Sequence, residues 1–253
     1  MTVYRAKGIE LRLGDWREVL QDVEPDAVIT DPPYSARTHA GHNDATDQTR
    51  SITGQLTRAE LSYGCMAQDE IGAFASEWMR RARGWIALMN SHDAIPAFER
   101  AAGDAGRYHF APVPIIQKRP RLLGDGPASW AVYLLVARRR TQEAARWGCL
   151  PGAYFSTTDR TGIVAGAKPL PLMREIVRDY SRPGDLVCDP CAGGGTTLIA
   201  AAMEGREAIG AEIDPETFER ACARIDGTAI TPPLLVEQAP PAHQLDLLGE
   251  GKV

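Results

Sequence analysis

The sequence predicts an α/β fold in which helices cover both faces of a mostly parallel sheet. Short apolar segments, typical of buried strands, alternate along the chain with segments whose apolar residues recur at helical spacing. Three consecutive glycines join one of these strands to the helix that follows it. With 253 residues, of which 44% are hydrophobic and 24% charged, the chain can form one large domain of this class.

The first half of the chain is predicted to contain five strands and two helices. Apolar and charged residues alternate over 9–13, as in a half-exposed edge strand. The strand over 108–118 is expected to be irregular because it contains Pro112 and Pro114. The predicted strands cover 9–15, 26–30, 84–90, 108–118 and 130–139, and the predicted helices cover 69–84 and 94–103.

The second half is predicted to begin with a helix over 171–181 that has apolar residues on one face. A strand, the glycine loop and a helix follow over 185–205, and another strand covers 207–214. A last helix over 214–225 begins with Asp214, a residue type that favours the N-cap position.

The folded domain is expected to span 1–228, because residues 229–253 form a Pro-rich tail without helical periodicity. Five scattered cysteines, an odd number, indicate reduced thiols and a cytoplasmic protein rather than a disulfide framework. No apolar run approaches the roughly 20 residues that a membrane helix needs. The N-terminus also lacks the hydrophobic core of a signal peptide.

The glycine loop occupies the stretch DPCAGGGTT, residues 189–197. Glycines at such a place let the backbone approach a ligand and leave helix N-terminal N–H groups pointing at it, which suits a nucleotide-like cofactor with a carboxylate. The next strand ends at Glu212, whose carboxylate can accept hydrogen bonds from both ribose hydroxyls. The pattern is neither a phosphate-binding loop nor the dinucleotide spacing G-x-G-x-x-G, so hydride transfer is not indicated. A tight turn without a ligand is the alternative for a glycine loop alone.

Two motifs together indicate a family. The stretch DPPY, residues 31–34, and the glycine loop resemble the two hallmark motifs of the amino-directed DNA methyltransferases. Because DPPY precedes the glycine loop, the motif order resembles that of the permuted β group. Segments at 14–20 and 168–185 resemble two further motifs, so the resemblance covers about residues 9–225. It implies a Rossmann-like methyltransferase fold with a circularly permuted motif order, a mostly parallel seven-stranded sheet and S-adenosylmethionine as the cofactor.

The resemblance implies a role for each matching residue. The catalytic corner would consist of Asp31, Pro32, Pro33 and Tyr34. The cofactor would contact Asp15, Trp16, Asp31, Lys168, Asp189, Pro190, Cys191, Gly193, Gly195, Thr196, Glu212 and Ile213. The family usually has Phe at the position of Cys191 and Ser at the position of Gly194.

The chemistry of amino methylation accounts for the DPPY residues. The exocyclic nitrogen of a base is a poor nucleophile, and it improves when Asp31 accepts one amino hydrogen and the carbonyl group of Pro32 accepts the other. The two prolines fix the backbone so that these acceptors converge. Tyr34 offers a flat face to a base that has left the duplex. The sulfonium methyl group is already activated, so neither a metal ion nor a covalent nucleophile is required.

The leading hypothesis is a site-specific DNA adenine-N6 methyltransferase, either solitary or from a restriction–modification pair, of bacterial or phage origin. Cytosine-N4 methylation is the alternative within the same class, because Asp at position 31 occurs in both. The departures at Cys191 and Gly194 leave open a different class, a catalytically silent DNA- or clamp-binding protein on a methyltransferase scaffold. An RNA or protein substrate is also left open.

Double-stranded DNA is the expected partner, although the net charge of the chain is −5. Clustered basic residues can bind phosphates on an acidic protein, and solvated surface is the alternative for each cluster. The segment 35–65 is expected to form a DNA-proximal loop, and 138–167 a short target-recognition insert, which suggests a short or loosely read site. The expected DNA contacts are Tyr34, Arg37, His39, Lys118, Arg119, Arg138, Arg139, Arg140 and Arg146.

The tail contains QLDLL, residues 244–248, which resembles the pentapeptide that docks bacterial replication and repair proteins on the sliding clamp. Packing of the tail on its own domain or on a partner in a homodimer is the alternative. The expected clamp contacts are Gln244, Leu245, Leu247 and Leu248. Cys188 and Cys191 have zinc-like spacing, but no metal site is expected because successive side chains at a strand end point to opposite faces.

Overall fold

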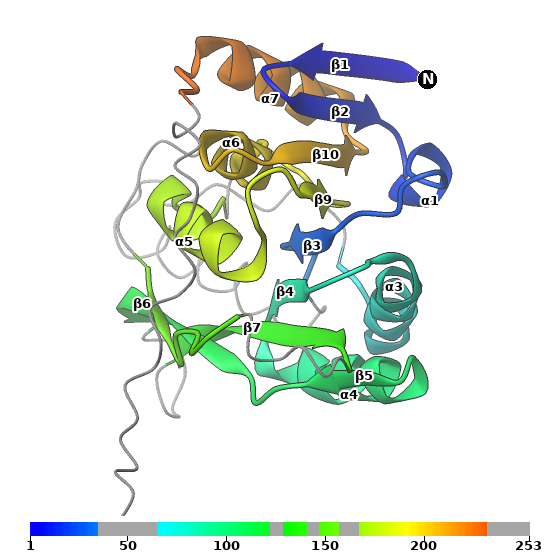
Figure 1. Ribbon diagram of the computed structural model, residues 1–253, viewed down its shortest axis with the longest axis vertical. Helices are drawn as coiled ribbons and strands as arrows, with labels where there is room; N and C mark the ends of the chain where they lie inside the picture. Colours follow the sequence, from blue (N-terminus) through cyan, green and yellow to red (C-terminus); the bar gives the residue numbers. More distant parts are fainter. Residues whose placement is uncertain (35–64, 122–128, 141–146, 157–166, 232–253) are drawn as a thin grey trace, which may run out of the picture.

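The computed structural model describes residues 1–34, 65–121, 129–140, 147–156 and 167–231 (Figure 1). Its strands are β1 (Thr2–Ala6), β2 (Ile9–Leu13), β3 (Ala27–Thr30), β4 (Ile86–Asn90), β5 (Arg107–His109), β6 (Val113–Arg121), β7 (Ser129–Arg139), β8 (Tyr154–Phe155), β9 (Leu186–Asp189) and β10 (Glu207–Glu212). Its helices are α1 (Trp16–Val19), α3 (Gln68–Arg81), the 3₁₀ helix η1 (His92–Ala94), α4 (Ile95–Asp104), α5 (Leu170–Tyr180), α6 (Thr196–Met203) and α7 (Pro215–Gly227).

All ten strands of the described residues join one sheet in the order β1-β2-β10-β9-β3-β4-β7-β6-β8, with β5 paired to β7. The strands from β2 to β4 are parallel, whereas β7 runs antiparallel to β4. The carboxyl ends of β3, β9 and β10 therefore meet at one edge of the sheet, where α/β proteins place their ligand sites. The predicted α/β Rossmann-like fold is confirmed, but the expected number of seven strands is too low because the short strands β1, β5 and β8 extend the sheet.

The sequence analysis predicts an edge strand over 9–13, but this strand lies inside the sheet. β2 pairs with β10 on one side and with β1 on the other, through a register that aligns Ala6 with Ile9. The two residues between them, Lys7 and Gly8, both have positive φ angles, of 55° and 76°. Two such residues form the tight turn whose twist suits a two-residue hairpin.

The single strand predicted over 108–118 is divided in two. β5 ends at His109, and β6 begins at Val113. Pro112 lies in the interruption and has no N–H group to donate to a neighbouring strand, which explains why the pairing stops there.

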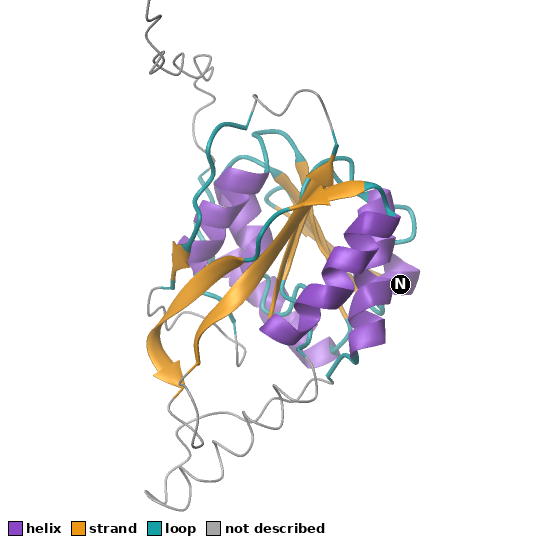
Figure 2. Ribbon diagram, turned by 90° about the horizontal axis from the view of Figure 1, so that it is seen from below, coloured by secondary structure: helices purple, strands orange, loops and turns teal. Residues whose placement is uncertain are grey.

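Helices cover both faces of the sheet (Figure 2). α5, α6 and α7 bury apolar side chains in one core cluster, which includes Leu172, Ile176 and Leu198. α3 and α4 bury theirs in a second cluster on the other face, which includes Phe74 and Trp78. Within the described residues, no helix combines the length and apolar character that a membrane crossing requires.

Candidate active site

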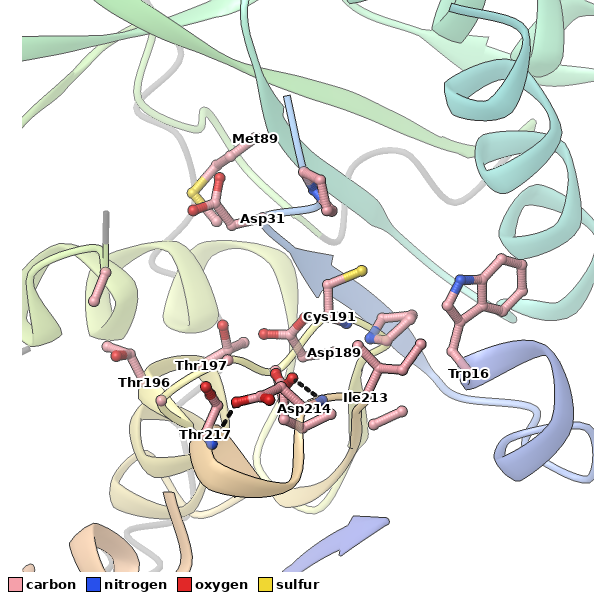
Figure 3. A pocket seen from close by; sticks show the side chains of 18 of the residues that line it. Trp16, Asp31, Met89, Asp189, Cys191, Thr196, Thr197, Ile213, Asp214 and Thr217 are labelled. Atoms are coloured by element: carbon pink, nitrogen blue, oxygen red, sulfur yellow. Dashed lines mark hydrogen bonds between the residues drawn. The ribbon is translucent and has the colours of Figure 1, made fainter. Parts of the chain in front are cut away.

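A cavity of about 490 Å³ lies at the carboxyl edge of the central strands (Figure 3). Its walls come from the segments that follow β2, β3, β9 and β10. The lining includes Asp15, Trp16, Asp31, Pro33, Lys168, Asp189, Pro190, Cys191, Gly193, Thr196, Glu212 and Ile213. The two motifs that are 158 positions apart in the sequence (189 − 31 = 158) therefore share one cavity, which is within the size range of small-molecule sites.

A direct contact joins the two motif strands. β3 and β9 are parallel neighbours, and the hydroxyl group of Thr30 donates a hydrogen bond of 2.7 Å to Oδ1 of the buried Asp189. Thr30 ends β3, so Asp31 follows at the position where the chain leaves the sheet. The sheet itself thus places the first residue of DPPY beside the glycine loop.

Asp31 pairs with a lysine. Its Oδ2 accepts a short hydrogen bond from Nζ of Lys168, while its Oδ1 is buried and has no hydrogen-bond partner among the described residues. Nζ of Lys168 also lies 5.3 Å from the centre of the Tyr34 ring. Burial would lower the pKa of Lys168, but Asp31 and Tyr34 outweigh it and raise that pKa above its ordinary value. The ammonium group is therefore charged at neutral pH.

The glycine loop has a conformation that glycine favours. Gly193 and Gly195 have φ angles of +50° and +74°, in the left-handed region that side chains with a Cβ rarely adopt. Arg224 from α7 donates 2.8 Å hydrogen bonds to the carbonyl group of Gly194 and to Oγ1 of Thr196, so it braces the loop from outside. The loop ends at the N-terminus of the buried helix α6.

Two carboxylates in the cavity wall have raised pKa values. Burial raises the pKa of Asp189 to about 6, although hydrogen bonds from Thr197, Thr30 and the backbone of Cys191 act in the opposite direction. Burial also raises the pKa of Glu212, which ends β10 and accepts a hydrogen bond of 2.8 Å from the N–H group of Asp214. Burial likewise raises the pKa of the Cys191 thiol well above its usual range, so this side chain forms a neutral part of the wall.

One wall of the cavity is apolar. Trp16, at the start of α1, packs edge-on against Phe74 with ring centres 5.1 Å apart. Ile213 also lines the cavity and leaves 68% of its surface exposed, which is unusual for a large aliphatic side chain next to buried strands. Trp16 and Ile213 therefore offer apolar surface that a flat ring could cover.

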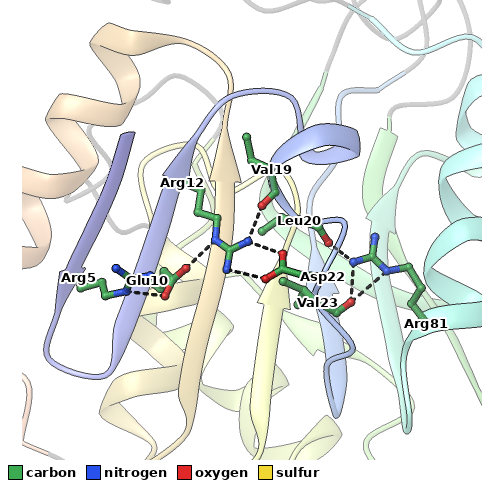
Figure 4. Close-up of polar contacts among 8 residues, drawn as sticks. All are labelled: Arg5, Glu10, Arg12, Val19, Leu20, Asp22, Val23 and Arg81. Carbon is green, nitrogen blue, oxygen red and sulfur yellow. Dashed lines mark hydrogen bonds and ion pairs between the residues drawn. The ribbon is translucent and has the colours of Figure 1, made fainter. Parts of the chain in front are cut away.

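A polar network fixes the segment that carries Trp16 (Figure 4). The largely buried Arg12 donates 2.6 Å hydrogen bonds to the carbonyl group of Val19, to Asp22 and to Glu10. Arg81 from α3 binds the carbonyl groups of Leu20 and Val23. Two guanidinium groups thus hold the end of α1 between β2 and α3.

Most of the residues expected to bind the cofactor line the cavity. Gly195 is not part of the lining but forms the N-cap of α6, where a Cβ would meet Ile225 and Ala221 of α7 at 3.7–3.8 Å. Pro32 is buried behind the corner. Tyr34 is partly buried, and its hydroxyl group has a raised pKa because of burial and the neighbouring Asp31.

The expected DNA contacts do not gather in one place. Lys118 is exposed on β6, which runs in the same direction as β4 and continues past its carboxyl end, so this lysine lies on the cavity side. Arg138, Arg139 and Arg140 lie at the opposite edge, because Ala137 pairs with Ile86 at the start of β4.

The three arginines make local contacts there. Arg138 lies 5.7 Å from the ring of Trp85, Arg139 donates to the carbonyl group of Ala82, and Arg140 lies 6.0 Å from the ring of Tyr108. They therefore lie away from Asp31, and their expected contacts to DNA remain a prediction. The physical reason is the antiparallel direction of β7, which carries its C-terminal residues away from the cavity.

Several expected residues lie outside the described part of the chain. They are Arg37, His39, Arg146, Gln244, Leu245, Leu247 and Leu248, and the side chain of Arg119 also belongs to this group. Within the described residues, no three His, Cys, Asp or Glu side chains come together as a metal site.

Some of the lining residues were not among the predicted site residues. Met66, Met89 and Met173 contribute thioether surface to the cavity from three separate segments. Met89 follows Leu88, which pairs with Thr30, so it lies beside Asp31. Met89 lies within β4 near its carboxyl end, so only the expectation that the last residues of a central strand face the site could have identified it. Arg224 carried no signal at all, because its role depends on the packing of α7.

The comparisons with known proteins agree with this geometry. Residues 140–223 match the family model described as DNA methylase. The match covers about a third of the chain, so it shows similarity to this family over that segment. The family match covers the glycine loop, Lys168 and Glu212 of the cavity, but it does not reach Asp31.

Two curated relatives are similar over part of the chain. The type II methyltransferase M.MthZI of Methanothermobacter thermautotrophicus is 44% identical over 104 residues, which are 36% of this chain and 29% of that protein. The DNA adenine methyltransferase YhdJ of Escherichia coli K12 is 42% identical over 59 residues, 23% of this chain and 20% of that protein. The chain thus spans less than a third of the length of these two relatives.

Solved structures of DNA methylases share the fold over most of the chain. The M1.HpyAVI–SAM complex has a TM-score of 0.61 at 19% identity and covers 86% of this chain and 99% of its own. The cytosine-N4-specific PvuII DNA methyltransferase also has a TM-score of 0.61, at 16% identity, and covers 86% of each chain. The sheet and its helices therefore form the Rossmann-like fold of the DNA methyltransferases.

Proposed function

We propose that this protein is a DNA methyltransferase that transfers a methyl group from S-adenosylmethionine to N6 of an adenine. The observation that carries the proposal is the Asp31 carboxylate, whose buried Oδ1 lacks a donor among the described residues and which shares a cavity with the glycine loop and Glu212. A buried acceptor without a donor costs free energy, and an amino group of the substrate would supply the missing N–H.

The cavity fits S-adenosylmethionine. A volume of about 490 Å³ suits a ligand of that size, and the apolar surfaces of Trp16 and Ile213 suit an adenine ring. The partly buried carboxylate of Glu212 can accept hydrogen bonds from ribose hydroxyls. The backbone N–H groups at the start of α6 can bind the carboxylate of the methionyl end.

The bound cofactor would supply an electrophilic methyl group on a positively charged sulfur. The residues of the chain prepare the nucleophile. Asp31 accepts a hydrogen of the amino group, which favours the tetrahedral nitrogen of the transition state over the planar nitrogen of the free base. The same carboxylate can then receive the proton that the methylated nitrogen loses and pass it to water. Tyr34 provides an aromatic face beside this acceptor for the displaced base.

We also propose that the protein belongs to the permuted β group and to the Asp-Pro-Pro-Tyr type. The motif order, with Asp31 before the glycine loop, supports the permuted β group and the Asp-Pro-Pro-Tyr type. Lys118 and the 52% exposed Trp130 extend beyond the carboxyl end of β4 on neighbouring strands, which suits contacts to DNA phosphate and to an unstacked base. Docking of 244–248 on a sliding clamp, a homodimer and a bacterial or phage origin remain predictions.

Cytosine-N4 methylation is the second candidate, because the fold is shared with the cytosine-N4-specific PvuII enzyme at the same TM-score. The test is to incubate the protein with unmethylated genomic DNA and labelled S-adenosylmethionine and to identify the modified nucleoside by mass spectrometry. N6-methyladenine is expected. N4-methylcytosine would select the second candidate, and no modified nucleoside would overturn the proposal in favour of a silent scaffold.

Two variants test whether methyl transfer depends on Asp31. Asp31→Ala should reduce methyl transfer by roughly 100-fold or more, the loss seen when one transition-state contact is removed. Asp69→Ala removes an exposed carboxylate in the first turn of α3 and should leave the rate unchanged. Equal rates of methyl transfer for both variants would show that the activity does not depend on Asp31 in the cavity.

A further inference from the structure

The lysine that the sequence resemblance assigned to the cofactor makes its strongest contact elsewhere. Lys168 precedes α5, and Asp31 follows β3, so the two residues are 137 positions apart. Their side chains are 16% and 24% exposed and form an ion pair in the cavity wall. Lys168 also faces the Tyr34 ring, so it contacts two of the four DPPY residues.

The two carboxylate oxygens of Asp31 have different surroundings. Oδ2 accepts from the ammonium group, and Oδ1 is left without a partner among the described residues. Met89 lies beside the carboxylate in the same wall (Figure 3). A methionine side chain is flexible enough to move aside for an incoming base.

We propose that Lys168 is a positioning residue that holds Asp31 as an anion and reserves its Oδ1 for the amino group of the target base. This inference rests on the proposed methyl transfer, whose substrate would donate the amino hydrogen.

The surroundings of Asp31 explain why it needs a cation. The ionisable groups that face it are Lys168, Tyr34, Asp189 and Cys191, and Lys168 is the cation among them. A cation beside a buried carboxylate favours its charged form, whereas a second carboxylate nearby opposes it. A protonated carboxyl group is a weaker acceptor than a carboxylate, because charge-assisted hydrogen bonds are the stronger ones.

The pairing also separates the roles of binding and catalysis. If Lys168 acts through Asp31, removing its charge should slow methyl transfer at saturating cofactor and leave cofactor affinity nearly unchanged. If it instead binds the cofactor, the same change should weaken cofactor binding and leave the rate at saturation intact.

The experiment compares Lys168→Met with Lys168→Arg. The methionine variant keeps the length without the charge, and kcat is expected to fall by roughly 30-fold or more while the Kd for S-adenosylmethionine, measured by calorimetry, stays within about twofold. Lys168→Arg should recover part of kcat, because it restores a cation beside Asp31. Arg100→Met, an exposed cation removed from α4, should change neither parameter.

A second measurement does not depend on activity. The chain has four lysines, at positions 7, 118, 168 and 252, so the signal of Lys168 can be assigned by NMR of lysine-labelled protein. Asp31→Asn should lower the pKa of Lys168, since burial lowers it and Asp31 raises it in the intact pair.

The outcomes that overturn the inference differ from those that overturn the function. An unchanged Lys168 titration in Asp31→Asn rejects the pairing, whether or not the protein methylates DNA. If Lys168→Met loses cofactor binding and keeps its kcat, Lys168 binds the cofactor and does not position Asp31. A wild-type protein that modifies no nucleoside overturns the proposed function, and with it the role of the pair in catalysis.

Discussion

Glu212 is the acceptor that the proposed ribose contact requires, and its replacement isolates that contact. Glu212→Gln keeps an oxygen for the N–H group of Asp214 but removes the charge that strengthens hydrogen bonds from the ribose hydroxyls. Loss of hydrogen bonds to a charged group costs about 1.5–3 kcal/mol, so cofactor affinity should fall by roughly 10- to 100-fold. Isothermal titration calorimetry measures the change. Glu207→Gln, at the exposed start of the same strand, is the control and should bind normally.

Asp189 makes the stability of the protein depend on pH in a defined direction. Its pKa in the folded state is raised to about 6, above the value of about 3.8 expected in the unfolded chain, so between these values the folded state holds more protons. The Asp189 contribution to stability is therefore largest below pH 4 and is lost as the pH rises through about 6.

Asp189→Asn removes this titration and keeps an oxygen that can accept from Thr30 and from the Cys191 backbone. The free energy of unfolding of the variant, relative to the wild type, should rise between pH 4 and pH 7 by roughly 1–3 kcal/mol and then stay level. Denaturant unfolding at pH 4.5 and 7.5 checks this. A difference between the two proteins that does not change with pH would contradict it.

The hydrogen bonds of Arg12 hold the end of helix α1 in place. Because Trp16 begins this helix and lines the cavity, these bonds also support the cavity wall. Arg12→Met removes the donors to Val19 and Asp22 and leaves the buried carbonyl group of Val19 without them. Amide hydrogen exchange over 19–23 should accelerate by roughly 10- to 100-fold, corresponding to about 1.5–3 kcal/mol of local stability. Mass spectrometry of peptides from deuterated protein resolves this segment. Arg5→Met removes an exposed arginine paired to the same Glu10 and should leave the exchange unchanged.

The whole sheet is assembled from interleaved halves of the chain. β10 and β9 come from the second half, yet they lie between β2 and β3 from the first half. A fragment of residues 1–140 would leave facing edges of β2 and β3 unpaired and their apolar faces uncovered by α5 and α6.

Neither 1–140 nor 141–253 should therefore show a cooperative thermal transition alone, whereas the mixed fragments should regain one. Circular dichroism melting curves measure this. The full chain cleaved once within 141–146 serves as the control and should keep its transition because every described strand retains its partners. Cooperative unfolding of the first fragment alone would contradict the interleaved assembly.

The order of the seven main strands and the five longer helices, the glycine loop and the DPPY corner could be predicted from the amino-acid sequence, whereas β1, α1, η1 and β8 were not predicted. These features depend on local physics: apolar periodicity, the backbone freedom of glycine and the chemistry that a carboxylate such as Glu212 can perform at a strand end. The shared cavity of Asp31 and Asp189 has a similarly simple cause, since the parallel strands β3 and β9 bring their carboxyl ends to one edge of the sheet.

Other features depend on contacts between distant parts of the chain. The pairing of Lys168 with Asp31, the bracing of the glycine loop by Arg224 and the pairing of β1 to β2 follow from packing and register. The arginines at 138–140 stand on the far edge because β7 is antiparallel, a direction that no residue in that strand specifies locally. Register and strand direction are settled by burial across the whole sheet, so they emerge only when the complete chain is folded.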